Sequence, residues 1–182
     1  MDADDAETVE STWAWRDLFG VRSAHEEAPE YIKSRDVYVR TVYDLITGYD
    51  DAATVLTREQ KVRRLGVVKQ VAADLFTLVD KSKTDGLSGD GLRSPTEWGY
   101  PVRGRECLGE VRYPDHGADV QQLHHRAYFG LPRTWPTVIL WLHAAAKPDV
   151  KLDSEWSTIQ DADIDRAITI RTDYYRDHGC CG

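Results

Sequence analysis

The sequence contains no long hydrophobic run and few cysteines. No apolar stretch approaches the roughly 20 residues that a helix needs to cross a bilayer, so we expect no membrane association. The N-terminus, MDADDAETVE, lacks the basic and apolar segments of a secretory signal, which favours a cytoplasmic location. Of the three cysteines, Cys180 and Cys181 are adjacent and poorly placed to pair with each other, so no disulfide framework is expected.

A basic character is also missing, because the formal net charge is −8. Phosphate binding usually rests on a basic surface, so this charge first argues against nucleic acid. The acids are concentrated at the N-terminus, however, where residues 1–36 hold ten acidic and four basic residues. The remainder is nearly neutral at −2. We therefore predict an acidic N-terminal extension over residues 1–36 and one domain over residues 37–182. An aromatic and apolar cluster within the extension is expected to dock on the domain; its members are Trp13, Trp15, Leu18 and Phe19.

The clearest helical pattern begins at Thr57. Thr57 and Gln60 match a capping box. Apolar residues then recur every three to four positions, at Val62, Leu65, Val68, Val71, Leu75, Leu78 and Val79. This spacing predicts one long amphipathic helix to about Asp80. Residues 36–46 are rich in β-branched and aromatic residues, which favours a strand there, with a helix as the alternative.

Three strands and a final helix are predicted in the C-terminal half. Residues 106–113 and 124–130 alternate in character and are joined by a turn, which indicates a hairpin. Residues 137–146 are almost continuously apolar, as in a central strand covered on both faces. Asp161 or Asp163 can cap a last helix that ends at Gly179. Its apolar stripe comprises Ile164, Ala167, Ile168 and Tyr175. The order predicts an α+β domain, with an antiparallel sheet packed by a long helix and followed by a terminal helix.

Four segments of this half resemble the successive blocks of a known family. They are LGEVR at residues 108–112, HRAYFG at 125–130, ILWLHAAAK at 139–147 and DIDRAITIRTDYY at 163–175. Their order and residue types resemble the RelE/HigB-like toxins of bacterial type II toxin–antitoxin systems. The resemblance covers residues 106–175 and implies the RelE/HigB-like fold, with a first strand near residues 38–46.

The resemblance implies a metal-independent mRNA endoribonuclease, acting on ribosome-bound or free mRNA, that inhibits translation, needs no cofactor and is controlled by a cognate antitoxin. Cleavage requires positive groups beside the scissile phosphate, and matching the family blocks assigns this role to Arg112, Arg126 and Lys147. Glu110, His124 and His143 are candidates for the proton transfers. Tyr128 and Tyr175 would bind the substrate. We expect His124, Arg126 and Tyr128 to share one face of their strand, and Glu110 and Arg112 one face of the neighbouring strand, so that one exposed, concave face of the sheet can hold these five side chains.

Other interpretations of the same residues remain open. Arg112 and Arg126 can be cross-strand partners of Glu110, since pairs of opposite charge are common on sheet faces. His143 can be a core histidine, and Tyr175 can serve packing alone. The functional alternatives are a non-catalytic protein of the toxin fold that acts by binding a protein target, and a phage or host regulatory protein that uses this fold for protein contacts.

Overall fold

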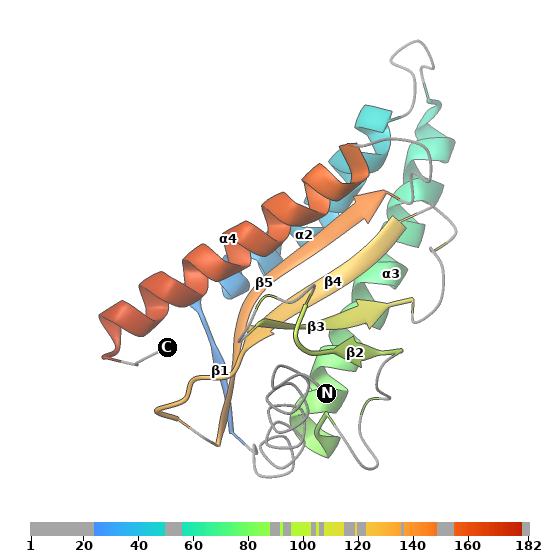
Figure 1. Ribbon diagram of the computed structural model, residues 1–182. Coiled ribbons are helices and arrows are strands. Elements are labelled where there is room, and N and C mark those ends of the chain that lie inside the picture. Colours follow the sequence, from blue (N-terminus) through green and yellow to red (C-terminus); the bar gives the residue numbers. More distant parts are fainter. Residues whose placement is uncertain are drawn as a thin grey trace, which may run out of the picture.

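The computed structural model describes residues 24–49, 56–87, 92, 96–102, 105, 108–114, 119, 123–135, 137–148 and 155–179 (Figure 1). These residues form an α+β structure with a five-stranded sheet and three helices. In chain order the elements are β1 (Ala24–Glu27), α2 (Pro29–Tyr49), α3 (Arg58–Asp85), β2 (Trp98–Gly99), β3 (Leu108–Tyr113), β4 (Leu123–Gly130), β5 (Val138–Pro148) and α4 (Glu155–Asp177). No helix in the described part of the chain is long and apolar enough to span a membrane.

The strand order is β1-β5-β4-β3-β2. The predicted β3–β4 hairpin is confirmed, with Arg112 opposite Arg126 and Glu110 opposite Tyr128. The β4–β5 pair is antiparallel as well, but β1 runs parallel to β5, so the prediction of a wholly antiparallel sheet is wrong at this edge. β5 lies between β1 and β4, while β4 holds the middle position.

Helices cover both faces of the sheet, with α2 and α3 on one side and α4 on the other (Figure 1). Tyr38 and Leu75 pack with Phe129 and Trp141 in the core beneath α2 and α3. The core beneath α4 contains Leu108, Tyr128, Leu140, Leu142, Ile164 and Ala167. The apolar run of β5 follows from this arrangement, because both sets of its side chains meet a helix.

The predicted strand at residues 36–46 is wrong, because these residues lie within α2. The buried side chains Tyr38, Val42 and Ile46 recur every four residues, so they form one helical stripe toward the core. Packing of that stripe outweighs the modest strand preference of β-branched residues. The first strand among the described residues is instead β1, and the predicted domain boundary after residue 36 falls inside α2. The docking cluster at Trp13, Trp15, Leu18 and Phe19 lies outside the described residues.

α3 confirms the predicted long helix and its capping box. The Thr57 hydroxyl accepts a hydrogen bond from the Gln60 amide, and the Gln60 side chain accepts one from the Thr57 amide. Val68, Val71, Leu75 and Val79 are buried as expected. Val62 is 63% exposed, because the part of α3 that packs in the core begins at Val68.

The terminal helix is longer than predicted. α4 begins at Glu155, six residues before Asp161, so neither Asp161 nor Asp163 caps it. Its stripe of Ile164, Ala167 and Tyr175 is buried as expected. Gly179 follows the helix with a φ of 64°, a left-handed conformation that suits a glycine at a helix end.

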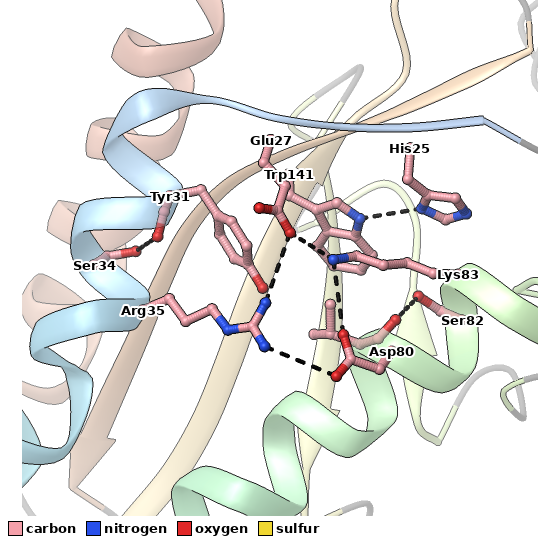
Figure 2. A network of polar contacts seen from close by, with 10 residues as sticks. His25, Glu27, Tyr31, Ser34, Arg35, Asp80, Ser82, Lys83 and Trp141 are labelled. Atoms are coloured by element: carbon pink, nitrogen blue, oxygen red, sulfur yellow. Dashed lines mark hydrogen bonds and ion pairs between the residues drawn. The ribbon is translucent and has the colours of Figure 1, made fainter.

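β1 is held to the helices by an ion-pair network (Figure 2). Glu27 contacts Lys83 at 2.5 Å and Arg35 at 3.8 Å, and Asp80 contacts the same two cations at 3.7 and 3.8 Å. The network joins β1, α2 and α3, so the short parallel strand has both main-chain and side-chain anchors.

Candidate functional site

The predicted polar residues lie on the side of the sheet that faces α4. The pairing of β3 with β4 puts Glu110 and Arg112 on the same face as Arg126 and Tyr128. On β5, His143 lies opposite Tyr128 and Lys147 lies opposite His124. The register of β5 shifts here, because Tyr128 faces His143 while Phe129 faces Trp141, which leaves Leu142 as an extra residue.

Glu110 lies between the two arginines. Its Oε1 is 2.8 Å from Nε of Arg112, and its Oε2 is 3.2 Å from Nε of Arg126. Arg112 and Arg126 are directly opposite each other on β3 and β4, where two like charges repel. The shared carboxylate offsets this repulsion. The three side chains together still carry a net positive charge, and we call them the Glu110–Arg112–Arg126 cluster.

The Glu110–Arg112–Arg126 cluster is buried more deeply than expected. The side chain of Glu110 is 6% exposed and that of Arg126 is 11% exposed, whereas Arg112 retains 29%. Burial lowers the pKa of Arg126, and the neighbouring Glu110 acts in the opposite direction. The expectation of an exposed face is therefore wrong at Arg126, because α4 packs on this side of the sheet. Arg112 is the member of the cluster most open to solvent.

α4 supplies two polar partners to β5. The Lys147 ammonium donates a hydrogen bond to Oε1 of Gln160 at 2.6 Å, and both residues are buried. Nε2 of His143 lies 3.8 Å from Oδ1 of Asp163. The His143 ring is nearly parallel to that of Tyr128, with centroids 6.5 Å apart. Its Nδ1 has no hydrogen-bond partner in the described part of the chain. His143 is thus buried as a core histidine would be, but with only one ring nitrogen near a partner.

The remaining predicted residues are placed differently. His124 is partly exposed on the cluster side of β4, opposite Lys147. Tyr128 is 1% exposed and packs beneath α4. Tyr175 is also buried in that core, beside Gly130 at the end of β4. The structure thus brings Glu110, Arg112 and Arg126 into contact and stacks Tyr128 on His143, while it leaves Tyr175 in the apolar packing of α4.

Sequence reasoning missed a second polar chain, on the opposite face of the sheet. Nε2 of His125 is 2.8 Å from Oδ2 of Asp119, and its Nδ1 is 2.9 Å from the hydroxyl oxygen of Tyr38. His125 is fully buried. The alternation of β4 places His125 on the core face, but its two partners come from distant or irregular segments. Asp163 and Gln160 were missed for the same reason, since no spacing in the sequence links them to β5.

No group of three His, Cys, Asp or Glu residues within the described ranges is arranged to hold a metal ion. Comparison of the chain with protein-family models, with curated proteins and with solved structures finds no match in any of the three.

Proposed function

We propose that the chain is a toxin of the RelE/HigB-like fold that cleaves mRNA in the cytoplasm, on the ribosome, and that a cognate antitoxin inhibits it. The observation that carries the proposal is the Glu110–Arg112–Arg126 cluster, in which two opposed guanidinium groups share one carboxylate. Holding like charges together in a weakly solvated site costs free energy. Such arrangements are typical of functional sites, where an anionic ligand completes the charge balance.

The cluster suits a phosphodiester undergoing attack by its own 2′-hydroxyl. The attack builds negative charge on the phosphate oxygens, and a guanidinium can donate two parallel hydrogen bonds to them. The phosphate would approach Arg112, the more exposed arginine, while the buried Arg126 on β4 and Lys147 on β5 add positive potential from the same side of the sheet.

The proton transfers fit the histidines better than Glu110. Glu110 contacts both arginines, so its role is to hold the two guanidinium groups in position. Nε2 of His143 lies 3.8 Å from Oδ1 of Asp163, and His124 is partly exposed on the same side of the sheet. An imidazole ring can both accept and donate a proton, which suits a general base or acid.

RNA cleavage by purified full-length protein tests the proposal. A 5′-labelled single-stranded RNA would be incubated in EDTA, with and without ribosomes. We expect cleavage products that end in a 2′,3′-cyclic phosphate, and a loss of about a hundredfold in rate for Arg112→Ala. Arg133→Ala, in the exposed turn before β5, is the matched control and should cleave normally. Intact RNA in every condition would refute the proposal.

A second candidate function is protein binding without catalysis. The burial of Glu110 and Arg126 favours it, because a buried ion pair can serve the fold alone. Growth arrest on expression alongside intact transcripts would support this candidate over the nuclease.

A further inference from the structure

A groove lies between α2 and α3, on the opposite face of the sheet from the Glu110–Arg112–Arg126 cluster. Its volume is about 440 Å³. Val39 and Tyr43 of α2 line it together with Val62 and Leu65 of α3. The groove is therefore a surface separate from the proposed nuclease site.

The apolar residues of α3 that line the groove extend the buried stripe of this helix toward its N-terminal end. Val62 and Leu65 precede Val68, where the core begins, and Val62 is 63% exposed. Leu65, Val39 and Tyr43 are partly exposed. Covering the apolar side chains of one groove with a partner is favourable, because their surface is removed from water.

Basic residues border this apolar lining. Arg58 and Lys61 of α3 and Arg40 of α2 line the groove, against one acid, Asp36. Arg40 lies 3.7 Å from Asp44, whereas Arg58 and Lys61 form no ion pair within the described part of the chain. Residues 58–69 hold five basic residues and one acid, in a chain whose net charge is −8. The groove therefore carries a local positive charge that is available to an acidic partner.

The shape and chemistry indicate a helical ligand. Two neighbouring helices form the walls, and aliphatic side chains lie between them, as in sites that accept the apolar face of an amphipathic helix. Single-stranded RNA would instead need several aromatic rings for stacking, and the lining provides only Tyr43. We propose that the α2–α3 groove binds an acidic amphipathic helix of a partner protein, with apolar residues on one face and Asp or Glu beside them.

Fluorescence anisotropy with full-length protein tests this directly. The probe is a labelled 16-residue helical peptide with leucines at i, i+3, i+4 and i+7 and glutamates elsewhere. A matched peptide carries lysines in place of the glutamates, and a 12-residue uridine RNA forms the third arm. We expect saturable binding of the acidic peptide alone, weakened by high salt because the rim charges are exposed.

Substitutions of groove residues test whether the peptide binds in the groove. Lys61→Glu should weaken the acidic peptide by about fivefold to tenfold, and Val62→Ser should weaken it at both high and low salt. Arg133→Glu makes the same charge change outside the groove and should bind as the wild type does. Failure of the acidic peptide to bind, equal binding of the two peptides, preference for the RNA, or wild-type affinity in Lys61→Glu would each overturn the proposal.

Discussion

Tyr38 of α2 and His125 of β4, 87 positions apart, are joined in the core by a 2.9 Å contact between the phenol oxygen and Nδ1. The Tyr38 hydroxyl also lies 3.0 Å from the carbonyl oxygen of Ala145, to which it can donate. His125 in turn contacts Asp119, so one chain of polar contacts connects α2, β4, β5 and the segment before β4. Such a buried chain specifies how α2 lies on the sheet, because each group needs its partner.

Two tyrosines of α2 allow a matched test of this relationship. Tyr38→Phe should lower the free energy of unfolding by about 1–2 kcal/mol, since His125 and Ala145 lose a buried hydroxyl. Tyr31 is equally buried, but its hydroxyl has no hydrogen-bond partner among the described residues. Tyr31→Phe should therefore be neutral or stabilising by about 1 kcal/mol. Urea unfolding of both variants measures the difference, and an equal loss in both would contradict it.

The free energy of unfolding should depend on pH through His25, which lies on β1. Its Nδ1 lies 3.1 Å from Nε1 of Trp141, which can only donate, so Nδ1 must be unprotonated (Figure 2). Burial, and then the charge of Lys83, lower the pKa of His25 below its ordinary value of 6.5. The unfolded chain therefore binds this proton more readily than the folded one. The stability contributed by His25 is present above pH 6.5 and is lost as the pH falls through the folded pKa.

The His25→Gln variant isolates this effect. The difference in unfolding free energy between wild type and variant should shrink as the pH is lowered from 7.5 to 5, because only the wild type loses the contribution of a neutral imidazole. Urea titrations at several pH values measure it. A difference that stays constant across this range would exclude His25 as the source of the pH dependence.

Replacing glycine by alanine should have opposite effects on protein stability at Gly109 and at Gly66. A Cβ at Gly109 on β3 would overlap the ring of Phe129, which is buried and unable to move away. Gly109→Ala should therefore destabilise the protein by about 2 kcal/mol or more. Gly66 lies in the middle of α3 with nothing near its Cβ position, so Gly66→Ala should stabilise by about 1 kcal/mol. Thermal melts of the two variants should shift in opposite directions.

Gly99 offers a way to disturb the candidate site without breaking the core. A Cβ at Gly99 would occupy the position of the Arg112 guanidinium, which is at the end of a flexible side chain and can move aside. Gly99→Ala should leave the unfolding free energy within about 1 kcal/mol, yet lower RNA cleavage by about tenfold or more if Arg112 binds the phosphate. Normal cleavage in a variant whose Arg112 resonances have shifted would remove Arg112 from the proposed site.

Arg126 should contribute measurably to the free energy of unfolding. Arg126→Ala leaves the buried Glu110 with one guanidinium, and the loss of a buried pair commonly costs about 3 kcal/mol. Arg126→Lys keeps the charge but loses the planar group, so it should recover part of that stability. Guanidinium chloride unfolding decides this, since a cost below about 0.5 kcal/mol in Arg126→Ala would show that the pair contributes little.

Some elements could be predicted from neighbouring residues alone. The capping box at Thr57 and the spacing from Val68 to Val79 specify α3, because a helix satisfies its hydrogen bonds within its own segment. The alternation of β3 and β4 likewise determined that Glu110, Arg112 and Arg126 share one face, since successive side chains of a strand point to opposite sides. Their direct contact depends in addition on the antiparallel register of β3 with β4, which sets Arg112 opposite Arg126.

Other features were decided only by the tertiary structure. Residues 36–46 have side chains compatible with a strand or a helix, and their packing on β5 and α3 selects the helix. The parallel pairing of β1 with β5 joins segments more than 100 residues apart, which no local pattern encodes. The burial of Arg126 depends on what covers its face, because alternation specifies the side of a strand on which a residue lies but not how far that side is open to solvent.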